Sequence, residues 1–186
     1  METYISILRG INVSGQKKIQ MADLKALYEE LKFKNIITYI QSGNVIFKAE
    51  KKLSCTELSK KIEKKIFDKY NFEVPVIIRT VAEMKKVITT NPFLRKKGID
   101  TERLYVTFLA EAAMKADLEK IEKLEFNPEK FIIIGKEVYL HCPNGYGRTK
   151  LNNNFFENKL NVTATTRNWN TVNRLVEMGE GCELMI

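Results

Sequence analysis

The feature that most constrains the fold is a change of hydrophobic spacing that recurs in the same order in both halves of the chain. Short apolar stretches, typical of strands, alternate with longer stretches whose apolar residues recur every three or four positions, typical of helices. The first half is expected to hold strands at 4–8, 36–40, 45–47 and 74–78, and helices at 21–33, 54–70 and from 80 to just before Pro92. Its predicted order is βαββαβ followed by a closing helix.

The second half repeats this order, although the two halves share negligible sequence identity. Strands are expected at 104–109, 131–134, 138–141 and 162–165, and helices at 114–124, 151–160 and 168–178. A βαββαβ unit is the ferredoxin-like, or α/β-plait, arrangement, in which both helices cover one face of a four-stranded antiparallel sheet. The sequence therefore predicts an α+β protein of two tandem ferredoxin-like subdomains, each followed by an extra helix.

A stretch rich in turn-forming and basic residues separates the two halves. Pro92, Gly98 and the basic run Arg95–Lys97 make residues 91–102 the natural linker, with its charges solvated. We therefore expect the first subdomain at 1–90 and the second at 103–186, each including its closing helix.

Composition and charge limit the class of protein. Of the 186 residues, 44% are hydrophobic, which is enough for a packed core, and 31 Lys and Arg against 23 Asp and Glu give a net charge of +8. Such a charge attracts polyanions. The single histidine excludes a multi-histidine metal site, and the three dispersed cysteines lack a CxxC pair. We expect no metal and no cofactor.

The sequence shows no targeting or membrane-spanning segment. The first residues lack a basic stretch followed by a long apolar one, and the longest apolar runs, such as 131–134, fall far short of the roughly 20 residues that a membrane helix needs. We expect a soluble, cytoplasmic protein without a membrane partner.

Two segments are expected to meet at one edge of the first sheet. In a split βαβ arrangement the first two strands run parallel, so their carboxyl ends lie at the same edge. The segment Arg9–Gly15 should therefore neighbour the hairpin Gln41–Asn44, and together they supply a guanidinium, carboxamides and a hydroxyl that suit an anion or a polar heterocycle. The candidate ligand-binding residues here are Arg9, Asn12, Gln41, Ser42 and Asn44.

The same residues also have a purely structural interpretation. Gly, Asn and Ser are common in turns, where Asn12 and Asn44 would bond to nearby backbone. The segment from Gly10 has the glycine spacing of a phosphate loop, but Gln16 and Lys17 stand where that motif needs Lys and then Ser or Thr. The sequence therefore argues against a nucleotide triphosphatase.

Two further segments place basic residues beside turns. The loop Pro143–Lys150 joins a strand to a helix, so Arg148 and Lys150 form either a candidate anion loop or a solvated turn. The polar segment around Trp169 contains Arg167 and Asn168. Trp169 has helical spacing with later apolar residues, which predicts a core position. Asn168 or Thr166 is expected to cap that helix, whereas Arg167 either pairs with a carboxylate or completes an anion site. Arg167 and Asn168 join the candidate ligand-binding residues.

Other chemistry has weaker support in the sequence. The second helix carries several lysines opposite its apolar stripe, which is typical of a solvated face and also of a nucleic-acid footprint. RNA-binding sheets expose aromatic residues on central strands, and candidates here are Tyr4 with Tyr39, or Tyr105 with Phe108, without an RNP-like pattern. Adjacent strand residues point to opposite faces, so neighbouring His141 and Cys142 should diverge rather than form a catalytic pair.

On these motifs the chain resembles a bacterial family known only as domain of unknown function 1697, over essentially its whole length. The N-terminal signature is carried by Leu8–Gly15, Met21, Leu24 and Thr38–Val45, the C-terminal signature by Ala164–Val172, and Asn91–Phe93 also fits. Ser14 stands where a second glycine is common. The resemblance implies two ferredoxin-like subdomains in tandem, and it implies no established activity, substrate or catalytic residue.

The first functional hypothesis is a non-catalytic binding module for an anionic ligand, either phosphorylated or a nucleic acid. Its basis is the basic net charge together with a site lacking acid–base and nucleophile pairs. One alternative is an enzyme that acts on a small polar substrate by positioning and electrostatic stabilisation. A second is a protein-interaction domain. The expected oligomeric state is a monomer or a weak dimer.

Overall fold

The computed structural model describes residues 1–184 and contains two four-stranded antiparallel sheets with six α-helices. The α+β class expected from the sequence is confirmed. Contacts divide the chain into two units: unit 1 comprises Met1–Lys86 together with the residues from Arg174 on, and unit 2 comprises Val87–Asn173.

Unit 1 is built around one antiparallel sheet with the strand order β2-β3-β1-β4. Its elements are β1 (Glu2–Leu8), α1 (Met21–Glu30), β2 (Lys34–Tyr39), β3 (Asn44–Ala49), α2 (Cys55–Tyr70), β4 (Val76–Thr80) and the first part of α3 (Val81–Thr89). Since β3 is antiparallel to both β1 and β2, those two strands run in the same direction and end at the same edge of the sheet.

Two capping boxes define where helices α2 and α3 begin. The Ser54 hydroxyl accepts the N–H of Glu57 at 3.2 Å, and the Glu57 carboxylate accepts the N–H of Ser54 at 2.8 Å. Thr80 and Glu83 exchange the same two bonds at 3.1 and 2.8 Å. Both pairs satisfy N–H groups that a helix start leaves without partners.

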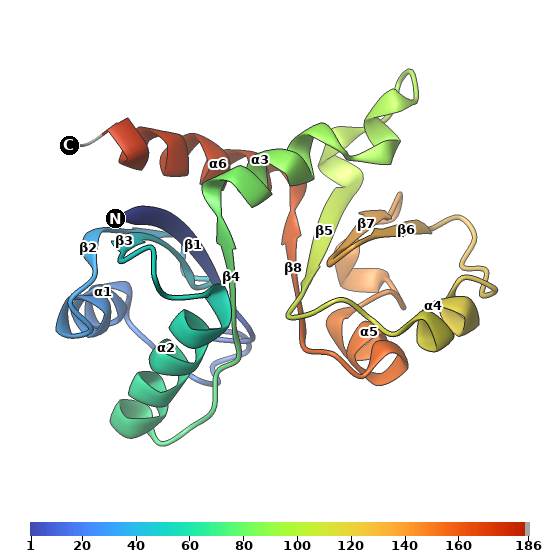
Figure 1. Cartoon of the computed structure of the whole chain (residues 1–186). Helices are drawn as coiled ribbons and strands as arrows, with labels where there is room; N and C mark the ends of the chain where they lie inside the picture. Colours follow the sequence, from blue (N-terminus) through green and yellow to red (C-terminus); the bar gives the residue numbers. More distant parts are fainter. Residues whose placement is uncertain (185–186) are drawn as a thin grey trace. The chain divides into compact units, whose positions relative to one another are not determined.

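The sheet of unit 1 is buried on both faces. On one face, Tyr4 of β1 and Phe47 of β3 belong to a core closed by apolar residues of α1 and α2. On the other face lies the second part of α6 (Trp169–Leu184), where an added side chain at Gly179 would lie 3.2 Å from Cδ1 of Ile5. Figure 1 shows this sheet between α1 and α2 on one side and α6 on the other.

Unit 2 has a sheet with the corresponding order β6-β7-β5-β8. Its elements are the 3₁₀ turns η1 (Pro92–Arg95) and η2 (Thr101–Arg103), β5 (Leu104–Leu109), α4 (Lys115–Ile121), β6 (Lys130–Ile134), β7 (Glu137–His141), the 3₁₀ turn η3 (Tyr146–Arg148), α5 (Asn153–Leu160) and β8 (Ala164–Asn168). One face carries a core that includes Leu140, Ile121 and Phe156. Figure 1 shows α4 and α5 on that side of the sheet.

The end of the chain differs from the expectation. The strand expected at 162–165 is β8 at Ala164–Asn168, and the helix expected at 168–178 is α6 at Trp169–Leu184. The prediction was wrong because Thr165, Thr166 and Arg167 are polar and therefore favour a loop, whereas the structure buries Arg167 to 9% exposure within the strand.

The linker and the division of the chain also differ from the expectation. Residues 91–102 form η1 and η2, and Phe93 is 1% exposed with its ring 6.0 Å from that of His141, so the segment is not simply solvated. Val87 belongs with unit 2, where its carbonyl accepts the hydroxyl of Tyr139 at 3.1 Å. The closing helix belongs with unit 1 from Arg174 on.

Candidate functional site

The segment after β1 and the β2–β3 hairpin lie side by side in unit 1, as the strand directions predict. The N–H of Leu8 donates to the carbonyl of Gly43 at 2.8 Å, and the N–H of Arg9 donates to that of Pro75 at 2.9 Å. The first bond joins β1 to the hairpin and the second joins it to the start of β4. After Arg9 the chain leaves the sheet, and α1 begins at Met21.

Asn12 holds this segment in place. Its Nδ2 donates to the carbonyls of Ile19 and Gln41, both at 2.9 Å, and its Oδ1 accepts the N–H of Ile19 at 2.9 Å. Its φ of 55° lies in the left-handed region, which asparagine tolerates better than most residues. These bonds agree with the structural interpretation of Asn12, because they join it to Ile19, just before α1, and to Gln41 of the hairpin.

The hairpin is held by a second asparagine. Asn44 is fully buried, and its Nδ2 donates to the carbonyl of Tyr39 at 3.1 Å and to the Ser42 hydroxyl at 2.9 Å. Gly43 has a φ of 75°, and an added Cβ would lie 2.7 Å from Cδ1 of Ile11. The side-chain bonds of buried Asn44 and the close packing at Gly43 therefore fix the conformation of the turn.

The segment and the hairpin border a surface cavity of about 510 Å³. Its lining residues are Asn12, Gly15, Lys18, Ile19, Gln20, Met21, Ala22 and Gln41. All of them belong to the described chain, and they carry one charge, the ammonium of Lys18, with no carboxylate, imidazole, thiol or hydroxyl. The polar side chains of the described lining are therefore carboxamides and one ammonium group.

Helix α1 begins at this cavity. No capping bond from the side chain of its N-cap residue, Gln20, is present in the described chain. The first bond of the helix runs from the N–H of Leu24 to the carbonyl of Gln20 at 2.9 Å. The preceding N–H groups include those of the lining residues Met21 and Ala22, and they carry the partial positive charge of a helix N-terminus.

The acidic residue of the first turn of α1 is not part of this lining. Burial first and the charge of Asp23 second raise the pKa of the Tyr70 phenol. Asp23 is absent from the described lining of the cavity.

The candidate residues of unit 1 thus have different positions. Gln41 and Asn12 line the cavity, whereas half-buried Arg9 and Ser42 are not among its described lining residues. Lys18 and Gln20 line it and were missed by the sequence reasoning, which stopped at Gly15. The signal that identifies them is their position directly before the first residue of a predicted helix.

The loop between β7 and α5 uses its backbone donors internally. The N–H groups of Gly145 and Thr149 donate to Cys142 and Tyr146 at 2.9 and 3.2 Å. The N-cap Asn152 accepts the N–H of Phe155 at 2.9 Å. The candidate anion-loop residues, Arg148 and Lys150, are exposed. The loop therefore resembles a capped turn more than an anion cradle.

Arg167 and Asn168 belong to the β8–α6 junction of unit 2. Nη1 of Arg167 donates to the Thr165 hydroxyl at 3.1 Å and to the Thr166 carbonyl at 2.9 Å, and burial lowers the pKa of its guanidinium to about 10. Asn168 accepts the N–H of Thr171 at 2.7 Å, which confirms the expected helix cap. Trp169 is 6% exposed, as expected for a core residue.

Several aromatic and catalytic candidates are buried. Tyr4 and Phe108 are 2% and 0% exposed, so they do not form the exposed platform that RNA-binding sheets use. Cys142 packs in the core of unit 2, where burial raises the pKa of its thiol to about 11, whereas His141 faces Phe93. The adjacent thiol and imidazole diverge, as strand geometry predicts.

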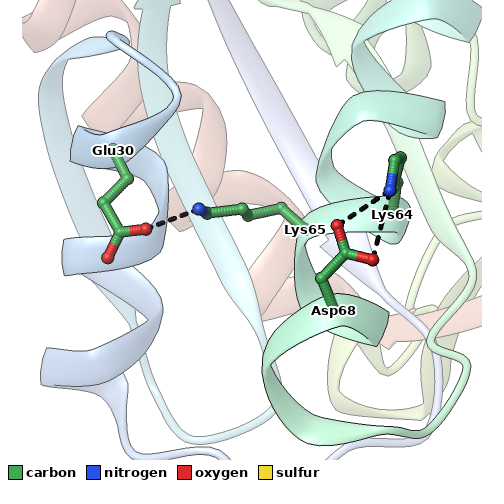
Figure 2. A network of polar contacts seen from close by, with 4 residues as sticks. All are labelled: Glu30, Lys64, Lys65 and Asp68. Atoms are coloured by element: carbon green, nitrogen blue, oxygen red, sulfur yellow. Dashed lines mark hydrogen bonds and ion pairs between the residues drawn. The ribbon is translucent and has the colours of Figure 1, made fainter.

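The lysines of α2 are partly neutralised by neighbouring carboxylates. Lys65 bonds to Glu30 of α1 at 2.6 Å, and Lys64 bonds to Asp68 at 2.9 Å (Figure 2). The bond and charge of Lys65 hold the pKa of Glu30 below its usual range. This face therefore agrees better with a solvated helix than with a continuous basic footprint.

Neither a metal-binding cluster nor a membrane-spanning helix is present among the described residues. Within residues 1–184 there is no group of three or more His, Cys, Asp or Glu side chains placed to hold a metal ion. Likewise, no helix in that part of the chain combines the length and apolar character needed to span a bilayer.

Comparisons with known proteins agree with the fold and name no activity. Conserved bacterial protein SP0830 from Streptococcus pneumoniae has a similar structure, with 22% identity, a TM-score of 0.75, and coverage of 96% of this chain and 98% of that chain. No curated protein sequence matches this chain. The family model matches residues 1–139, so the C-terminal signature at Ala164–Val172 lies outside the match. With that much of its 186 residues matched, the chain belongs to the family described as protein of unknown function (DUF1697).

Proposed function

We propose that the protein is a non-catalytic binding module for a phosphorylated ligand, and that the cavity at the start of α1 is its binding site. The observation that carries the proposal is the open N-terminus of α1 beside a cavity of about 510 Å³ whose only charged lining residue, among those described, is Lys18. Helix N-termini and lysine ammonium groups both favour phosphate oxygens.

The chemistry of the lining supports binding rather than catalysis. Lys18, Gln20 and Gln41 supply side-chain donors, and the described lining contains no carboxylate or imidazole to move a proton and no hydroxyl or thiol to act as nucleophile. The enzyme alternative would need such a group to be brought by the substrate or by another molecule.

The fold supports the proposal because it frees this edge for binding. We propose that each unit is a ferredoxin-like subdomain, an assignment supported by the strand orders β2-β3-β1-β4 and β6-β7-β5-β8. In such a unit the sheet and helices are complete without the extended connection between β1 and α1. The residues of that connection are therefore available to a ligand.

The first test measures binding of two classes of phosphorylated probe. Labelled short single-stranded RNA and DNA are titrated by fluorescence anisotropy from low to physiological salt, and nucleoside monophosphates and inorganic phosphate are titrated by ¹H–¹⁵N NMR. We expect saturable shifts at the amides of Met21 and Ala22. If binding disappears as the salt concentration rises and no amide at the start of α1 shifts, the attraction is a nonspecific effect of the +8 net charge.

A charge-matched pair of variants localises the site. Lys18→Ala removes the charged lining residue and should weaken phosphate binding about tenfold. Lys25→Ala removes an exposed lysine of α1 outside the described lining and should leave the affinity unchanged. Equal losses in both variants would show that the whole basic surface, and not the cavity, attracts the probe.

A further inference from the structure

Strand β6 of unit 2 is an edge strand with exposed apolar side chains. It lies at the end of the strand order, and Ile132 and Ile134 are 39% and 41% exposed. Natural edge strands are usually protected by charges, proline or a bulge, because their open peptide groups pair readily with another strand. β6 carries one charged residue, Lys130, and pairs with β7 without a register shift.

The pairing of β7 identifies the open peptide groups of β6. Leu109 of β5 donates its N–H to the carbonyl of Lys136 at 2.9 Å, so Lys136 faces β5 and the next residue, Glu137, faces β6. The backbone N–H and C=O groups of Ile134, the partner of Glu137 on β6, therefore face β7, as do those of Ile132 and Lys130. Phe131 and Ile133 direct their N–H and C=O groups to the open edge.

A cavity of about 450 Å³ follows this edge. Phe93 of η1 and Lys96 just after it line one part of the cavity. The α4–β6 connection contributes Glu122, Leu124, Glu125, Phe126, Asn127 and Glu129, and residues 130–133 line it from β6 itself. Phe126 of the connection packs with the unit 2 core, whereas Phe93 packs on His141 of β7. The cavity therefore offers apolar surface along the strand, where a neighbouring strand would place its side chains.

The lining of this cavity is acidic within a basic protein. Glu122 and Glu125 are exposed lining residues, and Glu129 accepts the hydroxyl of Thr149 at 2.7 Å. Two ammonium groups, those of Lys96 and Lys130, oppose these three carboxylates, so the lining has a net charge of −1. A ligand with a basic side chain facing Glu122 and Glu125 is therefore complementary to this cavity.

We infer that the open edge of β6 binds an extended peptide that adds a strand to the second sheet, with small apolar side chains at alternate positions in the cavity and a basic side chain facing Glu122 and Glu125. Backbone bonds to Phe131 and Ile133 supply affinity, and the cavity and its carboxylates supply selectivity. The inference is independent of the proposed phosphate site, which lies in unit 1.

A second copy of this chain fits the edge less well than a free peptide. The β6 of a second copy could offer its open edge, but its core-side residues are already engaged, with the ring of Phe131 5.9 Å from that of Phe156. To fill the cavity of about 450 Å³, a partner must have side chains that are not already packed in its own core. An extended peptide has such side chains, whereas the β6 of a folded copy does not.

The experiment uses the full chain and a labelled synthetic peptide of alternating valine and threonine with a lysine near each end. Binding is followed by fluorescence anisotropy and by ¹H–¹⁵N NMR. We expect saturable binding, with the largest amide shifts at Phe131 and Ile133. The same peptide N-methylated on alternate amides should bind about tenfold more weakly, because it loses donors to the edge while the protein is unchanged.

Variants of the protein test the edge and the charge separately. Ile133→Pro removes an outward N–H, a position where edge strands tolerate proline, and should abolish binding. Glu122→Lys combined with Glu125→Lys should weaken the lysine peptide about tenfold and favour its glutamate counterpart. The control Glu119→Lys, on exposed α4 surface outside the described lining, should change neither affinity.

Three results would overturn the inference. The first is equal binding of the N-methylated peptide, which would show adsorption on apolar surface. The second is loss of affinity in Glu119→Lys equal to that in the double variant, which would show a general charge effect. The third is a dimer in sedimentation that Ile133→Pro dissociates and that excludes the peptide, which would assign the edge to a second copy of the chain.

Discussion

The two units use the same backbone bonds where their first strands end, and then diverge. Leu8 donates to Gly43 at 2.8 Å in unit 1, and Leu109 donates to Lys136 at 2.9 Å in unit 2. The next residue of each unit bonds to the residue just before its last strand, also at 2.9 Å in both. Beyond these bonds, unit 1 has the connection 9–20 and the turn 40–43, whereas unit 2 has only 110–114 and 135–136.

This difference separates what the fold requires from what has been added to it. Unit 2 closes the same strand order with short turns, so the longer segments of unit 1 are not needed for the sheet. They border the cavity of about 510 Å³ instead. The edge strands of the two sheets also differ. β2 of unit 1 is interrupted by a register shift between Lys34 and Ile37, whereas β6 of unit 2 pairs regularly and its outer edge is open.

The largest expected effect tests how tightly the unit 1 turn is packed. In Gly43→Ala, the new Cβ would lie 2.7 Å from Cδ1 of Ile11 and 2.8 Å from Cβ of Leu8, at a φ of 75°. Strain and overlap together should lower the free energy of unfolding by about 3 kcal/mol, measured by urea denaturation.

The corresponding turn of unit 2 provides the control. Gly135 has a φ of 63°, and its nearest neighbour to an added Cβ is Oε2 of Glu137 at 4.0 Å. Gly135→Ala should therefore cost about 1 kcal/mol, from the backbone alone. Equal losses in the two variants would mean that the unit 1 turn is no more constrained than the short turn of unit 2.

The second prediction removes the bonds that hold the added segment. Asn12→Gly keeps the left-handed backbone accessible but loses the three side-chain bonds to Ile19 and Gln41. The expected loss is about 2 kcal/mol, with faster hydrogen exchange at the Ile19 amide. Asn71→Gly, at an exposed left-handed helix end with a φ of 57°, should change stability by less than about 0.5 kcal/mol. A neutral Asn12→Gly would show that the segment is held by other contacts.

The comparison of the units also shows what the sequence could and could not predict. Hydrophobic spacing located most strands and helices of both units, because burial imposes that pattern on the sequence. The parallel direction of β1 and β2 placed Asn12 beside Gln41 correctly. β8 was misplaced because its buried Arg167 is satisfied by Thr165 and Thr166, a solution that hydrophobic spacing does not reveal.

The juxtaposition of the two segments was predicted, but the bonding of their side chains was not. The sequence identified residues capable of hydrogen bonding, and it could not determine which of their groups are already bonded. Asn44 and Asn12 have internal partners, whereas Lys18 and Gln20 reach the cavity because α1 begins immediately after them. That distinction depends on where the connection folds back, which is set by contacts distant in the sequence.

The third prediction concerns two exposed isoleucines, one that begins the turn 40–43 of unit 1 and one that precedes the turn 135–136 of unit 2. Ile40 is 48% exposed and has a φ of 50°, a strained value for a β-branched residue, whereas Ile134 is 41% exposed within β6. Ile40→Asn should raise the free energy of unfolding by about 1 kcal/mol, visible as a higher thermal midpoint. Ile134→Asn should lower it slightly, since strands disfavour asparagine. A destabilised Ile40→Asn would mean that the side chain of Ile40 contributes more than its backbone strain costs.

The smallest expected effect is a dependence on pH confined to unit 2. His141 on β7 is the only histidine, and burial, then the charges of Lys96 and Lys130, lower its pKa while Asp100 opposes them. The corresponding position on β3 is Lys48, so unit 1 has no imidazole there. A lowered folded-state pKa means that the unfolded chain binds the proton first. The stabilisation is therefore complete above the ordinary histidine pKa of about 6.5 and is lost as pH falls through the lowered value.

His141→Gln should flatten the pH dependence of the unfolding free energy between about pH 7 and 5.5, above the range in which carboxylates titrate. An unchanged slope in that variant would assign the pH dependence to groups other than the imidazole.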